Sequence, residues 1–240
     1  MNILITGGAS GLGEAITKTL AKNENNVVYF TFNKSVAAAK KLEKQFKNVK
    51  GIQCNFEEES TLKSLSEIIN ELDLDVVIHN AYNGDYLKSH FHKIDSNDFL
   101  TDFKANVIPV VEISQAAITH FRKKKSGKII TILTSALQGM PPIGSAVYTS
   151  NKAYLEKLTQ VWANENTKFN ITSNSISPSF METAMTSATD DRVKEQMIES
   201  NPLKRLLTTN EVAEAVQFLV NDVTQINGKD FVINAGSILK

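Results

Sequence analysis

The sequence of 240 residues contains one cysteine, Cys54, and therefore cannot form an internal disulfide. A chain with so little cysteine suits a reducing compartment, and we expect a cytoplasmic protein. No apolar run approaches the ~18 consecutive residues of a membrane helix, and the N-terminal residues lack the basic region of a secretory signal. We therefore expect no membrane partner.

An excess of charge is also absent, because 26 Lys and Arg residues balance 26 Asp and Glu residues. A chain without net charge has no overall field that attracts nucleic acid, so no nucleic-acid partner is expected.

Metal-ligand patterns are lacking too. His90 and His92 alternate on a polar stretch without a nearby cysteine, and we interpret them as surface residues. The sequence thus predicts no metal site.

What the sequence does contain is an alternation of short apolar runs with longer amphipathic stretches. This pattern predicts a parallel sheet with crossover helices, and consecutive apolar positions such as Val76–Ile78 indicate strands covered on both faces. The predicted strands are Asn2–Ile5, Asn26–Phe32, Gly51–Cys54, Val76–His79, Lys128–Leu133, Thr172–Ile176 and Asp230–Ile233. The predicted helices are Glu14–Lys22, Val36–Phe46, Ser60–Leu72, Ser96–Lys125, Val147–Asn166 and Asn210–Val220.

These elements predict an α/β fold: a single doubly wound domain of the Rossmann type over residues 1–240, with a seven-stranded parallel sheet and helices on both faces. A domain of this length can bury a large core without disulfides. Residues 178–205 are polar and only weakly periodic in their middle. Because a long irregular insertion is usually a lid or a binding loop, we predict a substrate loop here.

A glycine-rich turn follows the first predicted strand: Thr6-Gly7-Gly8-Ala9-Ser10-Gly11-Leu12-Gly13, with a helical stretch directly after it. Glycines let the backbone approach a pyrophosphate, and the start of a helix presents free N–H groups and a favourable dipole. The turn lacks the Lys-Ser/Thr ending of a P-loop. A dinucleotide is therefore favoured over a nucleoside triphosphate.

Tyr148 and Lys152 open an amphipathic helix and, being four residues apart, lie on one helical face. A phenol with a pKa near 10 is a poor base at neutral pH, but a neighbouring ammonium favours the phenolate. The pair therefore indicates acid–base chemistry on a carbonyl or an alcohol. Taken alone, such a pair is common on exposed helices.

Polar residues at the carboxyl ends of strands strengthen this interpretation. Ser135 follows the strand Lys128–Leu133, and Asn80 follows Val76–His79, so both belong to the edge where open α/β sheets bind ligands. Asn106 lies within the predicted helix Ser96–Lys125, where asparagine is unfavourable. It either faces solvent or holds a water that extends a proton path from Lys152.

Together these residues resemble the short-chain dehydrogenase/reductase family of the compact type, over essentially the whole chain. The similarity depends on the glycine turn, on His79-Asn80-Ala81, and on the interval of thirteen residues from Ser135 to Tyr148. From Pro178 onward the chain is most similar to bacterial 3-oxoacyl-[acyl-carrier-protein] reductases, as in Asn201-Pro202-Leu203-Lys204-Arg205.

The resemblance implies a nicotinamide-dependent oxidoreductase. It assigns the acid/base to Tyr148, its assistant to Lys152, carbonyl orientation to Ser135 and a relay water to Asn106. The residues that it assigns to the cofactor are Gly7, Ser10, Gly11, Leu12, Gly13, Asn33, Lys34, Asn55, Asn80, Ala81, Tyr148, Lys152, Pro178 and Thr183.

Four features depart from the family pattern: three single residues and the segment Asn234-Ala235-Gly236, which replaces the more usual Asp-Gly-Gly. Tyr82 stands where the family has the glycine of Asn-Ala-Gly, which predicts crowding beside the cofactor's ribose. Asn55 replaces an aspartate that commonly binds the adenine amino group, and its amide oxygen can accept the same bond. Ser179 replaces the glycine of Pro-Gly. No catalytic group is lost, so these changes bear on substrate identity and cofactor affinity.

The end of the second strand favours NADPH, with NAD as the alternative. By similarity, Phe32 occupies the position of the acid that binds the ribose 2′-hydroxyl in NAD-dependent relatives and repels a 2′-phosphate. Lys34 follows with a cation that can bind that phosphate. Ser10 stands where many NADP-dependent relatives carry a basic residue, so Lys34 is the one cation in view.

The substrate and partners are less constrained. The first hypothesis is reduction of a 3-oxoacyl thioester or a similar ketone in fatty acid biosynthesis. The alternatives are a dehydrogenase of a sugar, polyol or steroid alcohol and, from another class, an inactive dinucleotide-binding sensor. The resemblance also implies a homo-oligomer, either a tetramer or a dimer. It places Lys125 and Lys168 near a basic surface on which an acyl carrier protein could dock.

Overall fold

The computed structural model describes residues 1–87, 89–183, 186–187, 189–221 and 225–238. Its strands are β1 (Asn2–Ile5), β2 (Val27–Phe32), β3 (Val49–Gln53), β4 (Val76–His79), β5 (Gly127–Ile132), β6 (Ile171–Pro178) and β7 (Asp230–Ile233). The α-helices are α1 (Gly11–Ala21), α2 (Val36–Gln45), α3 (Glu59–Glu71), α4 (Ser96–Asn106), α5 (Ile108–Lys124), α6 (Ala146–Asn166), α7 (Asp191–Ser200) and α8 (Thr209–Val220). Short 3-10 turns are η1 (Phe91–Lys93), η2 (Ser135–Leu137) and η3 (Thr167–Phe169).

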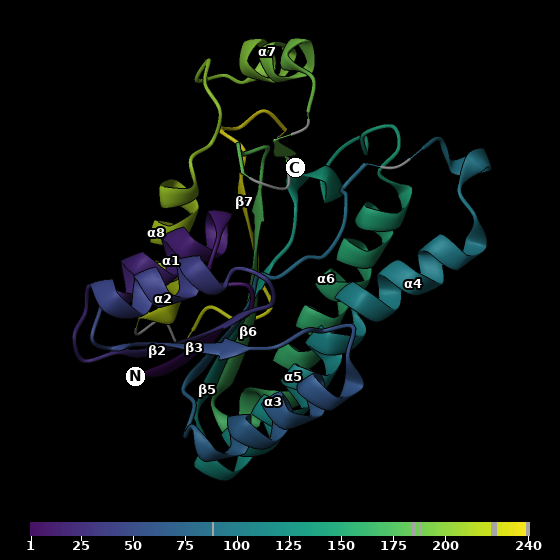
Figure 1. The fold of residues 1–240 in the computed structure, drawn as a ribbon. Helices are drawn as coiled ribbons and strands as arrows, with labels where there is room; N and C mark the ends of the chain where they lie inside the picture. The colour runs from purple at the N-terminus through teal and green to yellow at the C-terminus, as the bar shows by residue number, and fades with distance from the viewer. Residues whose placement is uncertain (88, 184–185, 188, 222–224, 239–240) are drawn as a thin grey trace.

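The strands form one parallel sheet in the order β3-β2-β1-β4-β5-β6-β7 (Figure 1). The chain winds outward from β1 to β3, returns to the middle at β4 and then winds outward to β7. The junction of β1 and β4 is therefore the topological switch point, beside which open α/β sheets bind their ligands. The predicted seven-stranded doubly wound sheet is confirmed.

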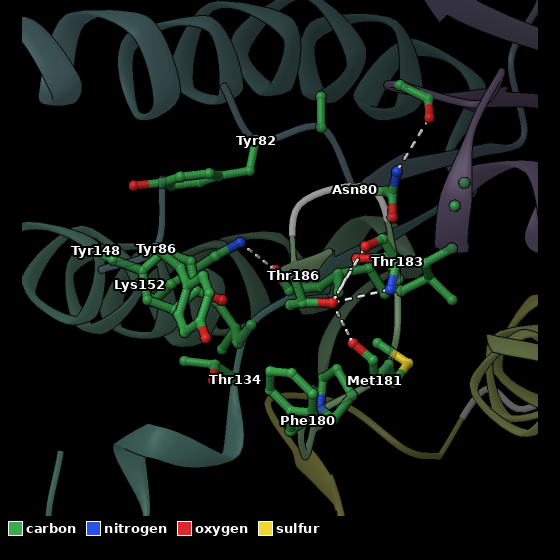
Figure 2. A pocket seen from close by; sticks show the side chains of 18 of the residues that line it. Asn80, Tyr82, Tyr86, Thr134, Tyr148, Lys152, Phe180, Met181, Thr183 and Thr186 are labelled. Carbon is green, nitrogen blue, oxygen red and sulfur yellow. Dashed lines mark hydrogen bonds between the residues drawn. The ribbon is translucent and has the colours of Figure 1, made fainter. Parts of the chain in front are cut away.

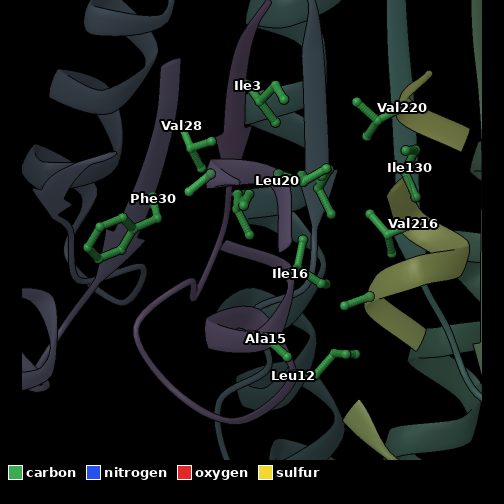
Figure 3. Packing of buried hydrophobic residues seen from close by; sticks show 14 of the residues in the cluster. Ile3, Leu12, Ala15, Ile16, Leu20, Val28, Phe30, Ile130, Val216 and Val220 are labelled. Carbon is green, nitrogen blue, oxygen red and sulfur yellow. The ribbon is translucent and has the colours of Figure 1, made fainter. Parts of the chain in front are cut away.

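The sheet has helices on both faces because successive strand residues point to opposite sides. Ile3 and Ile5 of β1 join the core under α1, α2 and α8, whereas Leu4 joins the core under α3, α5 and α6. Figure 3 shows the first of these cores, in which Ile16 of α1 and Val216 of α8 meet above the sheet. All five side chains are fully buried. The consecutive apolar runs in the sequence are explained by this double coverage.

Three predicted strands, Asn2–Ile5, Val76–His79 and Asp230–Ile233, have the predicted bounds, and the other strands shift by one or two residues at an end. The helix predicted over Val147–Asn166 begins one residue earlier, at Ala146. Both kinds of difference concern element ends, where local propensity is weakest and tertiary packing decides.

One prediction is wrong: the stretch Ser96–Lys125 is two helices, α4 and α5, separated at Val107. Pro109 lies in the first turn of α5. Proline has no N–H to donate to the carbonyl four residues earlier, and it disfavours helical backbone in the residue before it. Asn106 is consequently the last residue of α4 rather than a residue in mid-helix.

The predicted irregular stretch 178–205 contains the helix α7, whose N-cap Asp190 accepts a hydrogen bond from the backbone N–H of Arg192. Its residues 184–185 and 188 lie outside the described residues. Figure 1 shows α7 beyond the end of β7, on the side of the sheet where the parallel strands have their carboxyl ends. Within the described ranges, no helix is long and apolar enough to cross a membrane.

Candidate active site

A cavity of about 790 Å³ lies beyond the carboxyl ends of the central strands. Every site residue that the sequence predicts lines it. These are Gly7, Ser10, Gly11, Leu12, Gly13, Asn33, Lys34, Asn55, Asn80, Ala81, Asn106, Ser135, Tyr148, Lys152, Pro178 and Thr183. The fold therefore brings all of them to one place, although they come from eight separate stretches of the chain.

The glycine turn forms one wall of the cavity. Gly7 and Gly11 have φ angles of 67° and 54°, in the left-handed region that favours glycine. A Cβ atom on Gly13 would collide with the carbonyl oxygen of Gly7, so the backbone fits closely only because this residue is glycine. Helix α1 begins at Gly11, and the residues of its first turn, Gly11 to Gly13, line the cavity. Such a cradle suits a pyrophosphate.

The end of β4 holds this cradle in place. The side-chain amide of Asn80 donates to the carbonyl oxygens of Thr6 (3.0 Å) and Gly7 (3.3 Å). The backbone N–H groups of Asn80 and Ala81 both donate to the Thr6 hydroxyl, at 2.9 and 3.0 Å. Asn80 thus links β4 to the glycine turn across the switch point, and Figure 2 shows it beside the substrate loop.

The end of β2 carries the residues expected near the adenosine ribose. Asn33 donates from its amide to the Asn55 side-chain oxygen at 3.2 Å, and the Asn55 amide donates to Glu58 at 2.8 Å. The exposed Lys34 has no ion pair within the part of the chain that the structure describes. Its ammonium can therefore turn toward a ligand, whereas Asn33 is held by the neighbouring strand connection.

Tyr148 and Lys152 project from the first two turns of α6 into the cavity (Figure 2). The Lys152 ammonium is buried, lies 5.8 Å from the centroid of the Tyr148 ring and donates to the carbonyl oxygen of Ile132 at 2.8 Å. Burial lowers the pKa of Lys152 to about 8. Burial also raises the pKa of Tyr148 to about 12, opposed by a hydrogen bond with the Thr134 side chain. Tyr148 is therefore a neutral acid at physiological pH.

Two hydroxyls lie at the end of β5. Ser135, which the sequence predicts, begins the turn η2 and lines the cavity. Thr134, which no sequence motif predicts as a site residue, also lines the cavity, and its side chain opposes the rise in the pKa of Tyr148. Thr134 also caps η2 by accepting from the N–H of Ala136 at 3.3 Å. The only signal in the sequence for this residue is its place next to Ser135.

The side chain of Asn106 is engaged by the protein itself. Its oxygen accepts from the backbone N–H of Asn83 at 2.6 Å, and its amide donates to the carbonyl oxygen of Asn83 at 2.9 Å and to Asp102. Asn106 therefore fixes the loop that follows β4. A relay water at this residue would have to be held by its backbone rather than by its side chain.

Tyr82, which the sequence predicts to crowd the cofactor's ribose, lies directly beside Tyr148 and Lys152. Its ring meets the Tyr148 ring edge-on, with 4.9 Å between centroids and 81° between planes. Its hydroxyl donates to the carboxylate of Asp102 at 2.9 Å. The crowding predicted from the sequence is thus located against Tyr148 and Lys152.

The start of the substrate loop closes the cavity opposite the glycine turn. The Thr183 side chain approaches Gly11, where an added Cβ would lie 3.6 Å from the Thr183 Cβ. The Thr186 hydroxyl accepts from the N–H of Thr183 at 2.9 Å and donates to the carbonyl oxygen of Met181 at 2.7 Å. The Tyr86 and Thr189 hydroxyls are 2.9 Å apart, which ties the loop after β4 to this segment.

Comparison with known proteins agrees with the geometry. A family model described as enoyl-(acyl carrier protein) reductase, of the short-chain dehydrogenase type, matches residues 7–237. The 3-oxoacyl-[acyl-carrier-protein] reductases FabG of Staphylococcus epidermidis and Escherichia coli are each 31% identical to the chain; they align over 97% of it and over 97% and 95% of their own lengths. A solved short chain dehydrogenase/reductase family protein has a TM-score of 0.88 at 25% identity, with 98% of this chain and 96% of the other covered.

The chain belongs to the short-chain dehydrogenase/reductase family. It is an NAD(P)-dependent oxidoreductase that transfers a hydride between a nicotinamide and a carbonyl or alcohol. Within the described residues, no group of three or more His, Cys, Asp or Glu side chains is arranged to hold a metal ion.

Proposed function

We propose that this protein is an NADPH-dependent reductase of a 3-oxoacyl thioester or a similar small ketone. The observation that carries the proposal is the position of Tyr148 and Lys152, which lie in the same cavity as the glycine cradle. The similarity to the two FabG proteins over nearly the whole chain supports the substrate class. A sensor would need the cradle alone, so the complete set of catalytic groups favours an enzyme.

The proposed chemistry is a hydride transfer coupled to a proton transfer. The cofactor supplies the hydride that adds to the carbonyl carbon. Tyr148 donates its phenolic proton to the carbonyl oxygen, which yields the alcohol and leaves a phenolate. The positive charge of Lys152 stabilises that phenolate, because opposite charges in a buried site interact strongly. The Ser135 hydroxyl donates to the carbonyl oxygen and orients it, as hydrogen-bond donors at a developing oxyanion do.

The remaining proposed roles follow from the same geometry. The glycine turn and the start of α1 bind the pyrophosphate, with Asn80 and Ala81 supporting them from β4. Pro178 and Thr183, at the start of the substrate loop, line the cavity and would contact the nicotinamide. Asn106 holds the loop after β4, and a proton relay to solvent would pass its backbone.

The preference for NADPH is supported by the end of β2. Phe32 offers no carboxylate to bind a 2′-hydroxyl or to repel a 2′-phosphate. The unpaired Lys34 lies at the rim of the same cavity and can bind a phosphate as a point charge. The proposed location of this NADPH-dependent enzyme is the cytoplasm. The buried Cys54 is a free thiol, which suits a reducing compartment.

An acyl substrate is supported by the apolar part of the cavity wall. That wall is formed mainly by the substrate loop and by residues after β5 and β7: Met140, Phe180, Met181, Met197, Leu206 and Ile238. Aliphatic and aromatic side chains favour burial of a hydrocarbon chain over a sugar or polyol, whose hydroxyls need hydrogen-bond partners.

A carrier-linked substrate is supported by a basic surface where α5 and α6 end. Lys168 and Arg122 lie over the Phe169 ring, at 5.3 and 4.9 Å from its centroid, and Arg122 donates to Asn166 at 2.7 Å. Lys125 ends α5 with an exposed side chain. This surface suits the acidic face of a carrier protein.

A homo-oligomer is supported by apolar residues that the single chain leaves exposed. Leu100, Tyr154 and Val161 are 53%, 47% and 38% exposed on α4 and α6, and Phe218 on α8 is 51% exposed. Large exposed apolar groups on adjacent helices, as on α4 and α6, are typical of contacts between subunits, and Phe218 adds such a group on the other face of the sheet.

The function is tested by following the nicotinamide absorbance of purified protein with NADPH and three substrates: a 3-oxoacyl thioester, a simple ketone and a sugar ketone. The proposal expects fastest turnover with the thioester. Reduction of the sugar ketone without activity on the thioester or the simple ketone would contradict the substrate class, and absence of turnover with all three would favour a sensor.

A further inference from the structure

Tyr82 contacts both members of the catalytic pair. Its ring lies edge-on to Tyr148, and the Lys152 ammonium lies 5.5 Å from its centroid. Figure 2 shows Tyr82 directly above Tyr148 and Lys152. A lysine ammonium within about 6 Å of an aromatic face is attracted by the ring, more strongly when it is desolvated as here. One side chain from the loop after β4 therefore restricts the positions of both reacting groups.

The orientation of Tyr82 is fixed by a buried carboxylate. Asp102 is 6% exposed, and its Oδ1 atom accepts three hydrogen bonds. The donors are the Tyr82 hydroxyl at 2.9 Å, the Asn106 amide at 3.0 Å and the Asn151 amide at 2.9 Å. A buried charge is tolerated only where such donors surround it, and hydrogen bonds to a charged acceptor are the strong ones.

These three donors come from three parts of the fold. Tyr82 belongs to the loop after β4, Asn106 to the end of α4, and Asn151 to α6, where it directly precedes Lys152. Asp102 itself lies on α4. The carboxylate thus joins the helix that carries Tyr148 and Lys152 to the loop that carries Tyr82. A glycine at position 82 could make neither the ring contact nor the hydrogen bond.

Tyr82 is not a second acid. Burial, and then the charge of Asp102, hold the pKa of its phenol far above the ordinary value. It therefore keeps its proton and remains a hydrogen-bond donor to the carboxylate at every pH at which the enzyme works. Its contribution is geometric, and it acts through Tyr148 and Lys152.

We propose that Tyr82 and Asp102 form a positioning pair that fixes Tyr148 and Lys152 in reactive geometry. The inference depends on the proposed role of Tyr148. Small displacements of a reacting group cost large factors in rate, while substrate binding by the rest of the cavity is retained. The pair should therefore act on kcat rather than on KM.

The experiment compares Y82F, D102N and the double variant Y82F/D102N with wild type. Y82F keeps the ring and removes only the hydroxyl that Asp102 holds. The expected result is a fall in kcat of about 10-fold in each single variant, with KM for NADPH and ketone within about twofold, in keeping with the cost of misplacing a reacting group. The double variant should be no slower than the slower single variant, because Y82F removes the hydrogen bond between Tyr82 and Asp102, and the loss of the carboxylate charge in D102N weakens that same bond.

The matched control is Y29F. Tyr29 lies on β2 against Lys50, and its ring is not part of the cavity wall, so loss of its hydroxyl should leave kcat unchanged. Melting temperatures of all variants separate positioning from stability. An unchanged kcat in Y82F, or costs that simply add in Y82F/D102N, would overturn the proposal. If D102N fails to fold, Y82F alone decides.

The outcome for Tyr82 can be separated from that for the proposed function. If wild type reduces ketones and Y148F does not, the function stands whatever Y82F does. If Y148F keeps full turnover, the role of Tyr148 fails and a slow Y82F would need another explanation.

Discussion

The ammonium of Lys152 donates to the carbonyl oxygen of Ile132 at 2.8 Å, deep under the cavity that it serves. This hydrogen bond fixes the charge next to Tyr148 before any ligand arrives. Holding a buried ammonium costs folding free energy, which is expressed in its pKa of about 8 against an ordinary value of 10.5. The site is therefore prepared for catalysis at the expense of stability.

The first prediction concerns that cost. The pKa of Lys152 is lower in the folded protein than in the unfolded chain. Between pH 8 and 10.5 the unfolded chain therefore binds more protons at this group, and the free energy of unfolding rises as the pH rises through this range. Below pH 8 the full cost is present, about 3 kcal/mol at about 1.4 kcal/mol per pKa unit. K152M should thus be more stable than wild type at pH 7 and inactive.

Denaturant unfolding of both proteins at pH 7 and pH 10.5 measures this difference. The stability advantage of K152M should shrink as the pH rises, while other titrating groups affect both proteins equally. An advantage that is absent at pH 7, or that grows at high pH, would contradict a buried charged lysine.

The second prediction distinguishes the two hydroxyls at the end of β5. S135A should lower kcat by about 10- to 100-fold, since it removes a donor to the developing oxyanion. T134A removes the hydroxyl that opposes the rise in the pKa of Tyr148 and should lower kcat as well, while T134S keeps the hydroxyl and should retain most of the activity. Steady-state kinetics with one ketone suffices. If T134S is as slow as T134A, the hydroxyl of Thr134 is not what matters.

How much of this site could be predicted from the sequence depends on how local each signal is. The glycine turn and the pair of Tyr148 and Lys152 are short motifs next to predicted elements, and the sheet brings them together because its strands are parallel. All sixteen predicted site residues accordingly line one cavity. The sheet could be predicted as well, because strands buried on both faces leave uninterrupted apolar runs in the sequence.

The parts that were missed depend on contacts between distant residues. No sequence pattern indicates that Tyr82 and Asp102, twenty positions apart, are in contact. None indicates that Thr134 rather than Ser135 affects the phenol of Tyr148. The break between α4 and α5 is a different kind of error. Pro109, which has no backbone N–H, is a local signal for a helix break. The apolar periodicity continues on both sides of it and favours one long helix, so the prediction was wrong.

The third prediction concerns cofactor choice. Wild type should have a higher kcat/KM with NADPH than with NADH, and K34A should lose about 10-fold with NADPH alone, as expected for loss of one charge-assisted phosphate contact. The neighbouring exposed Lys40 on α2 provides a control, since K40A removes a cation that does not line the cavity. A wild-type preference for NADH would contradict the assignment, and an unchanged preference in K34A would remove Lys34 from it.

The fourth prediction concerns the carrier. Charge reversal in K125E/K168E should raise KM for a carrier-linked 3-oxoacyl substrate several-fold, because rim charges act mainly on association. The same variant should turn over a small carrier-free thioester like wild type, since neither lysine lines the cavity. Equal effects on both substrates, or none on either, would rule out docking at this surface.

The central claim is that Tyr148 supplies the proton for carbonyl reduction, and single-turnover reduction by Y148F tests it most directly. The phenylalanine ring preserves the packing against Tyr82 and removes only the ionisable hydroxyl. With NADPH prebound and its affinity measured separately, kcat should fall by about 10²- to 10⁴-fold, the usual contribution of general acid–base catalysis, while NADPH binding is retained. A Y148F enzyme that reduces the ketone within a few-fold of the wild-type rate would contradict the account.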